Sequence, residues 1–153
     1  KTHRSNTAGR WMLSLPLKSV NNLVKDARKV QQTILMVGDI SDIYVTNFNT
    51  MTGDPNFTVE ELSAIAFGYN RLLKESSDLL LDLKEVTTAT GLSMTDKERL
   101  DIINRIYGEV LEYKNLTWYY TRKNIGVSYL RSKEKGDAAR VLSLYGTHEQ
   151  RYW

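Results

Sequence analysis

The longest stretch with one uninterrupted hydrophobic period lies between Leu17 and Phe48. Its core-type positions alternate between spacings of three and four residues, which is typical of a helix with a coiled-coil seam. A helix beginning near Leu15 and running to Phe48, with Pro16 in its first turn, accounts for this pattern. Because so narrow a stripe cannot bury itself, this helix needs partner helices. The seam consists of Val20, Leu23, Ala27, Val30, Ile34, Val37, Ser41, Tyr44 and Phe48.

Turn-forming residues from Asn49 to Asn56 should end this first helix. Thr58 and Glu61 then match a capping box, in which a hydroxyl and a carboxylate satisfy backbone N–H groups at the start of a helix. We expect a second long helix from there to Thr90, with Gly91 just after its end. Its core face is Leu62, Ile65, Tyr69, Leu72, Ser76, Leu79, Leu83 and Val86, with Leu73 and Leu80 beside it.

Thr95 and Glu98 repeat the capping-box pattern and predict a third helix, which Gly126 bends and which ends before Lys135. Gly136 and Asp137 break the chain, and residues 138 to 145 have room for a short fourth helix that stops at Gly146. The predicted face of the third helix is Ile102, Ile106, Val110, Tyr113, Leu116 and Tyr120, with Leu100, Ile103 and Tyr107 beside it.

No strand-like alternation persists beyond a few residues. The pattern therefore predicts an all-α protein, an antiparallel bundle of three long helices plus a short C-terminal helix with coiled-coil-like packing. At 153 residues we expect one helical-bundle domain over 15–153, preceded by an irregular or disordered segment over 1–14.

Composition excludes several kinds of chemistry. The chain has no cysteine, which removes disulfides, thiol catalysis and cysteine-based zinc sites. Its two histidines, His3 and His148, do not stand at metal-ligand spacing, and the helices lack the Glu-x-x-His motif of a di-metal bundle. No glycine-rich phosphate loop occurs. We therefore predict a non-enzymatic protein with no catalytic residue, no metal site and no cofactor.

The charge is unevenly distributed along the chain. Residues 1–35 carry seven basic and one acidic side chain, residues 39–112 carry six basic and fourteen acidic, and residues 113–153 carry eight basic and three acidic. This pattern is typical of solvated helix faces, and it also fits a basic C-terminal surface that meets an anionic partner.

Aromatic and basic residues gather in the last third of the chain. Three readings are open: packing at the rim of the bundle, contact with another protein, or contact with DNA phosphates through Arg122, Lys123, Arg131, Lys133 and Lys135. Nucleic acid is the least expected partner, because no known binding module is recognisable. The candidate interaction surface consists of Trp118, Tyr119, Arg122, Lys123, Tyr129, Arg131, Lys133, Arg140, Tyr145, Tyr152 and Trp153.

No apolar run approaches the ~20 residues that a transmembrane helix needs. The opening KTHRSNTAGRWMLSLP has basic residues but no apolar core, so it is not predicted to be an intact signal peptide. The helical seam also permits self-association.

Four long strings and the C-terminal RYW resemble one protein family. The strings are LKSVNNLVKDARKVQQTILMVGDISDIYV (17–45), DPNFTVEELSAIAFGYNRLL (54–73), TGLSMTDKERLD (90–101) and YYTRKNIGVSYLRSKEKGDAARVLSLYG (119–146). They are similar to the conjugal-transfer proteins called TraI in Bacteroidetes conjugative transposons, a family unrelated to the relaxase of that name and remotely similar to type IV secretion minor pilins. The resemblance spans residues 17–153.

The resemblance implies a structural or adhesive component of a conjugative type IV secretion apparatus. Such a component works in the periplasm or cell envelope of a Gram-negative bacterium, by contacts with other conjugative-transfer proteins. Members of the family begin with a secretory signal and a further helical stretch, a pattern that residues 1–16 do not match. The resemblance implies no catalytic residue. The alternative function is a DNA-contacting accessory factor that uses the basic aromatic C-terminal face.

Overall fold

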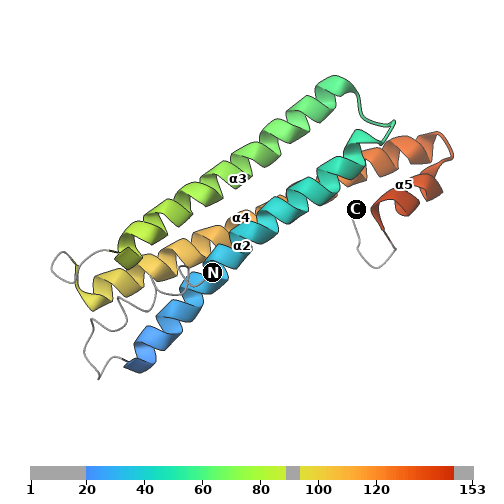
Figure 1. The fold of residues 1–153 in the computed structure, drawn as a ribbon. Helices are drawn as coiled ribbons and strands as arrows, with labels where there is room; N and C mark the ends of the chain where they lie inside the picture. The colour runs from blue at the N-terminus through green and yellow to red at the C-terminus, as the bar shows by residue number, and fades with distance from the viewer. Residues whose placement is uncertain (1–19, 89–93, 147–153) are drawn as a thin grey trace, which may run out of the picture. The chain divides into compact units, whose positions relative to one another are not determined.

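The computed structural model describes residues 20–88 and 94–146, and this part of the chain is all-helical. Its elements are α2 (Val20–Thr52), α3 (Val59–Thr88), α4 (Asp96–Glu134) and α5 (Ala138–Tyr145) (Figure 1). The predicted bundle of three long helices and a short C-terminal one is confirmed. The predictions for residues 1–14, for a helix start at Leu15 and for Gly91 concern residues outside the described ranges.

The first predicted helix extends further than expected, because α2 continues past Phe48 to Thr52. Side chains in its last turns bond back to the helix: the Asn47 amide donates to the Ile43 carbonyl at 2.8 Å and the Thr50 hydroxyl donates to the Thr46 carbonyl at 3.2 Å. Met51 is fully buried. Burial of this side chain outweighs the turn preference of its neighbours. Intrinsic helix propensity does not include this burial, so it places the end of the helix too early.

Both predicted capping boxes are confirmed. At the start of α3, the Thr58 N–H donates to Glu61 Oε1 at 2.9 Å and the Glu61 N–H donates to Thr58 Oγ1 at 3.1 Å. At the start of α4, the same reciprocal bonds join Thr95 and Glu98, both at 3.1 Å. These contacts satisfy N–H groups that a helix start leaves without an internal partner.

The turn between α4 and α5 forms where it was predicted. Gly136 has a φ of +71°, a left-handed conformation that glycine adopts without strain. The Asp137 N–H donates to the Ser132 carbonyl at 2.7 Å and the Gly136 N–H to the Lys133 carbonyl at 3.1 Å, which together make a Schellman motif. The predicted short helix matches α5, while α4 continues through Gly126 as helix.

The chain divides into two compact units, and each long helix contributes a part to both. Among the described residues, unit 1 contains 20–37, 75–88 and 94–112, and unit 2 contains 38–74 and 113–146. The expectation of one domain over 15–153 stays a prediction. The core of unit 1 is Val30, Met36, Val37, Leu83, Val86, Ile103, Ile106 and Val110.

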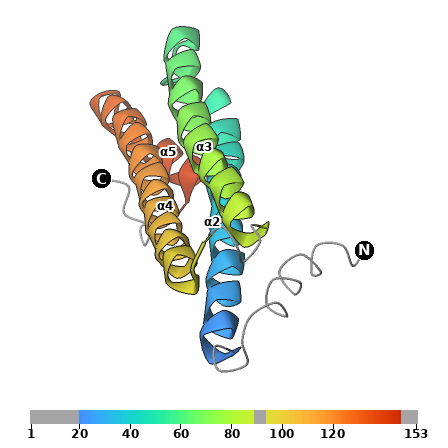
Figure 2. The same cartoon turned by 90° about the vertical axis from the view of Figure 1, so that its left-hand side faces the viewer.

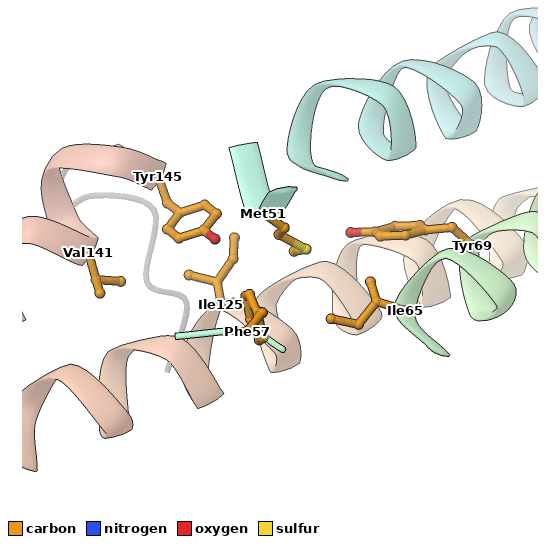
Figure 3. Close-up of a cluster of buried hydrophobic side chains, with 7 residues drawn as sticks. All are labelled: Met51, Phe57, Ile65, Tyr69, Ile125, Val141 and Tyr145. Atoms are coloured by element: carbon orange, nitrogen blue, oxygen red, sulfur yellow. The ribbon is translucent and has the colours of Figure 1, made fainter. Parts of the chain in front are cut away.

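In unit 2 the segments of α3 and α4 lie side by side (Figure 2). A buried cluster there joins α2, the loop 53–58, α3, α4 and α5 (Figure 3). It consists of Met51, Phe57, Ile65, Tyr69, Ile125, Val141 and Tyr145, with Tyr44, Phe48, Leu62, Tyr120, Val127 and Tyr129 packed against it.

The predicted core faces are correct for α3 and partly wrong for α2 and α4. Ile34 is 51% exposed and Leu116 is 46% exposed, although both were assigned to the core. Thr33 and Ile40 are fully buried instead of Ile34 and Ser41. The pattern of alternating threes and fours drifts against the true helical period of 3.6 residues, so it misplaces individual positions by one residue.

Candidate functional site

A stack of aromatic rings fills the middle of unit 2. The rings of Tyr44 and Tyr69 lie nearly parallel with their centroids 4.7 Å apart, and Tyr120 meets Tyr69 edge to face at 5.0 Å. The Tyr69 hydroxyl is 2.6 Å from the Thr121 hydroxyl oxygen. Burial raises the pKa of Tyr69 to about 12, so this phenol stays protonated and acts as a packing group with a satisfied hydrogen bond.

A glycine on α3 makes room for one of these rings. Tyr120 occupies the place where a Cβ at position 68 would stand, and its hydroxyl donates to the Ile65 carbonyl at 3.1 Å. Gly68 therefore allows α4 to lay a tyrosine across the backbone of α3.

The loop 53–58 sends a buried carboxyl group between α4 and α5. The Tyr145 hydroxyl donates to Asp54 Oδ2 at 2.7 Å, the Ser128 hydroxyl donates to the same oxygen, and the Asn56 N–H donates to Asp54 Oδ1 at 2.9 Å. Asp54 is 2% exposed. Burial and the adjacent Asp54 carboxyl raise the pKa of Tyr145, so its hydroxyl remains a donor.

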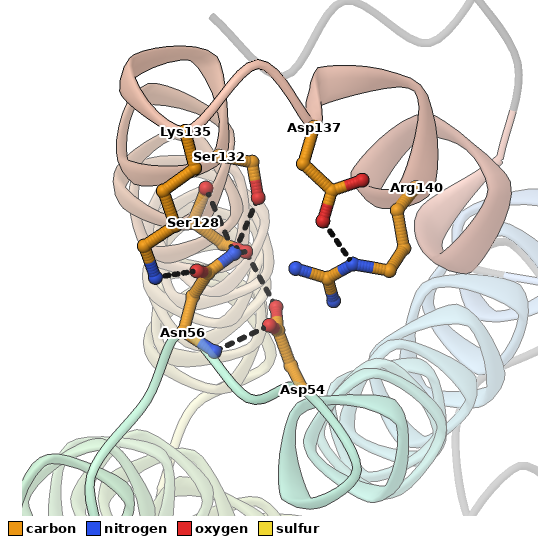
Figure 4. Close-up of polar contacts among 7 residues, drawn as sticks. All are labelled: Asp54, Asn56, Ser128, Ser132, Lys135, Asp137 and Arg140. Carbon is orange, nitrogen blue, oxygen red and sulfur yellow. Dashed lines mark hydrogen bonds and ion pairs between the residues drawn. The ribbon is translucent and has the colours of Figure 1, made fainter.

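Asn56 fastens the same loop to the end of α4 (Figure 4). Its side-chain amide donates to the Ser132 hydroxyl at 2.6 Å and to the Ser128 carbonyl at 3.2 Å. Its side-chain oxygen accepts from Lys135 Nζ at 3.1 Å. Asp54, Asn56, Ser128, Ser132 and Tyr145, here called the loop network, thus hold the loop to α4 and α5.

An ion pair between Arg131 and Glu61 lies next to the loop network. Arg131 donates two hydrogen bonds to the Glu61 carboxylate, at 2.8 and 2.6 Å, and a third to the Asn56 carbonyl at 2.7 Å. Hydrogen bonds from Arg131 and from the Thr58 backbone lower the pKa of Glu61 from 4.5 to about 2. Glu61 thus serves both as a helix cap and as the partner of Arg131.

The residues of the predicted interaction surface differ in their exposure and in their bonding. Tyr145 is buried, which removes it from that surface, while Arg131 is engaged with Glu61 and Arg140 donates to Asp137 at 2.6 Å. Trp118, Arg122 and Tyr129 are half-buried, and Tyr119, Lys123 and Lys133 are exposed. Tyr152 and Trp153 lie outside the described residues. That the remaining residues form an interaction surface stays a prediction.

An apolar stripe runs along the outward side of α4, and it combines Tyr119, Lys123 and Lys133 of the predicted interaction surface with Leu116 and Leu130, which the sequence did not assign to that surface. We call it the outer stripe. Leu116, Tyr119 and Leu130 are 46%, 54% and 58% exposed, and Lys123 lies with its Nζ 5.6 Å from the Tyr119 ring centroid. The residues of the stripe form a second series at helical spacings, in addition to the series that predicts the core face of the same helix. The outer stripe consists of Leu116, Tyr119, Lys123, Leu130 and Lys133.

The inward side of the same part of α4 is rich in hydroxyl groups. Thr117, Thr121, Ser128 and Ser132 are fully buried, and Ile125 is the large apolar residue among them. Small hydroxyl residues let the loop 53–58 and the tyrosine stack approach α4, and each finds a hydrogen-bond partner. In unit 2, α4 thus buries hydroxyls and exposes leucines.

Unit 1 contains a shallow cavity of about 180 Å³, lined by Lys25, Asp26, Lys29, Leu100 and Asn104. The Lys29 ammonium donates to the Asn104 side-chain oxygen at 2.9 Å. Burial raises the pKa of Asp26, while Lys29 opposes this shift. The cavity is smaller than the ~300 Å³ at which small-molecule sites begin.

Among residues 20–88 and 94–146, no group of three or more histidine, cysteine or acidic side chains is arranged to hold a metal ion. In the same ranges, none of the helices combines the length and apolar character needed to cross a membrane. Comparison with models of known protein families, with curated proteins and with solved structures finds no match to this chain.

Proposed function

We propose that this chain is a non-enzymatic structural or adhesive component of a conjugative type IV secretion apparatus, acting through protein–protein contacts. The resemblance of its sequence to the TraI proteins of conjugative transposons supports this setting, and we propose that the chain works in the periplasm or envelope of a Gram-negative bacterium. The partners are then other conjugative-transfer proteins.

The observation that carries the proposal is the outer stripe of α4. Three large side chains, Leu116, Tyr119 and Leu130, are exposed along one side of a helix whose other side buries hydroxyl groups. Isolated exposed apolar residues are ordinary, but a series on one helix face among basic side chains is typical of a protein-contact surface. A helical scaffold that presents such a surface suits a structural role.

Gene deletion tests the proposed setting. The gene is removed from its conjugative element, the transfer frequency is measured, and the intact gene is supplied in trans as the control. We expect transfer to fall on deletion and to recover on complementation. Unchanged transfer after deletion contradicts the proposal.

Substitutions test whether the outer stripe is the working surface. Complementation with Leu116→Ser/Leu130→Ser should restore transfer poorly, because these changes remove apolar contact area without altering the buried side of α4. The matched control is Val45→Ser/Val59→Ser, which removes two exposed valines from α2 and α3. Equal protein levels of both variants must be verified by immunoblotting, and equal transfer by both would show that the stripe is not the surface used.

Contact with DNA has less support from the geometry. Of the five cations considered for it, Arg131 is bonded to Glu61 and Lys135 to Asn56. Phosphate binding weakens steeply as salt rises, so a titration of duplex DNA at low and moderate salt separates this function from a protein-contact role. Absence of a mobility shift at low salt removes it.

A further inference from the structure

The outer stripe of α4 carries basic as well as apolar side chains. The α4 segment of unit 2, residues 113–134, has five basic side chains and one acidic one, and two of the five, Lys114 and Arg131, are paired with Asp39 and Glu61. Lys123 and Lys133 are exposed within the stripe itself. A partner that covers Leu116, Tyr119 and Leu130 must therefore bring negative charge next to its own apolar residues.

The chain itself carries a surface of that description on α3 in unit 1. Leu81 is 61% exposed, and Asp82 and Glu85 beside it are exposed. Asp78, also exposed, lies one helical turn before Leu81 on the same side. Residues 75–88 hold four acidic and one basic side chain. We call Asp78, Leu81, Asp82 and Glu85 the acidic patch of α3.

Two outer stripes are unsuited to pairing with each other. In a two-fold contact between identical helix faces, residues near the middle of the face meet their own copies. Lys123 stands midway between Leu116 and Leu130, so a symmetric pair would place lysine against lysine, with further cations around it. Like charges opposite each other disfavour this arrangement.

We propose that the outer stripe of α4 binds the acidic patch of α3 on a second copy of this chain. Leu81 of one copy packs against the exposed apolar residues of the stripe, while Asp82 and Glu85 approach Lys123 and Lys133. The contact joins two different surfaces, so an open assembly keeps one unoccupied stripe at one end and one unoccupied patch at the other, and assembly continues until a ring closes or an open chain results. This inference rests on the proposed function only for its cellular setting.

Sedimentation velocity of the full 153-residue chain tests self-association directly. We expect the weight-average sedimentation coefficient to rise with concentration at low salt, and the association to weaken as salt increases, because exposed charges are screened. A chain that stays monomeric at every concentration and salt level overturns the inference.

Charge reversal identifies the two surfaces. Lys123→Glu/Lys133→Glu and, separately, Asp82→Lys/Glu85→Lys should each weaken self-association at least tenfold. An equimolar mixture of the two variants should associate again, because each acidic stripe then meets a basic patch and each basic stripe meets an acidic patch. The control is Lys25→Glu/Arg28→Glu, which reverses two exposed cations on α2 outside both surfaces and should leave association unchanged.

The mixing experiment makes the outcome decisive. Recovery in the mixture supports the pairing of the two surfaces, since a folding defect in either variant does not produce it. Failure of the mixture to associate, or equal weakening by the control, overturns the inference. Transfer that depends on the gene while the chain remains monomeric would overturn this inference alone and leave the proposed function standing.

Discussion

Gly68 on α3 leaves space for the side chain of Tyr120 on α4. In a helix interior, glycine is less favourable than alanine by up to about 1 kcal/mol, so its presence at position 68 has a local cost. This cost is offset by the Tyr120 ring, which packs in the space of the missing side chain and whose hydroxyl donates to the Ile65 carbonyl.

Replacement of this glycine should destabilise the protein. Gly68→Ala places a methyl group where the Tyr120 ring lies, and we expect a loss of about 1–3 kcal/mol in the free energy of unfolding. Gly108→Ala on α4 is the control, since apart from its chain neighbours and the adjoining backbone of α4 no atom lies within 4 Å of its added Cβ. The control should gain up to about 1 kcal/mol from helix propensity. Urea denaturation measures both, and a gain for Gly68→Ala would refute this account.

The pKa of Glu61 links stability to pH. Because folding lowers this pKa from 4.5 to about 2, the ionised carboxylate stabilises the native state above pH 4.5, and this contribution disappears as pH falls toward 2. Glu61→Gln keeps the shape of the helix cap and removes the charge that faces Arg131. The variant should therefore be less stable than the parent at pH 7, and the difference should shrink between pH 4.5 and 2.

Glu98→Gln is the matched control for this experiment. Glu98 has the same capping geometry, and the hydrogen bonds from the Thr95 backbone and side chain lower its pKa. The described structure shows no arginine bonded to its carboxylate in the way that Arg131 binds Glu61. Unfolding free energies measured from pH 7 to 2 should show a larger pH-dependent difference at position 61. Identical profiles would count against the role of Arg131.

At the scale of elements, α5 depends on the loop 53–58 for its position. This helix has only eight residues, too few to be stable alone, and it buries Val141 and Tyr145. The loop network supplies the polar half of the attachment through the Tyr145 hydroxyl and Asp54.

Tyr145→Phe should weaken this attachment. It removes the hydroxyl that donates to Asp54 and keeps the ring, so we expect a loss of about 1–3 kcal/mol in unfolding free energy. Tyr119→Phe is the control on the exposed side of α4 and should change stability by less than about 0.5 kcal/mol. Chemical denaturation compares the two, and hydrogen exchange in residues 138–145 should speed up only in the first. Equal stability of the two variants would show that the hydroxyl adds nothing.

At the scale of the whole molecule, two compact units share three helices. Each of α2, α3 and α4 contributes a segment to both units, and helix formation is cooperative along a continuous segment. We therefore expect the cores of the two units to unfold together.

We expect a substitution in the core of either unit to shift the same single unfolding transition. Ile103→Ala in unit 1 and Ile125→Ala in unit 2 each remove most of a fully buried side chain, and we expect each to cost about 2–5 kcal/mol. Circular dichroism during urea denaturation should show a single transition that either substitution shifts as a whole. Two separate transitions, one affected by each substitution, would mean that the units unfold independently.

The helices could be predicted from the amino-acid sequence, because their signals are local. Capping boxes at Thr58 and Thr95, a left-handed turn at Gly136 and the apolar face of α3 each depend on residues a few positions apart. The conjugative-transfer setting was inferred from the sequence alone and stays a proposal.

Which helix faces are buried and which polar groups meet depends on contacts between elements that are distant in the sequence. Asp54 and Tyr145 are 91 positions apart, and no local pattern indicates that they bond. The sequence placed Leu116 in the core, but the long-range bonds of Asn56 to Ser128 and Ser132 turn the hydroxyl side of α4 inward and leave the leucine outside. Hydrophobic periodicity ranks positions by their own side chains, whereas burial also depends on the hydrogen-bond partners that other elements bring.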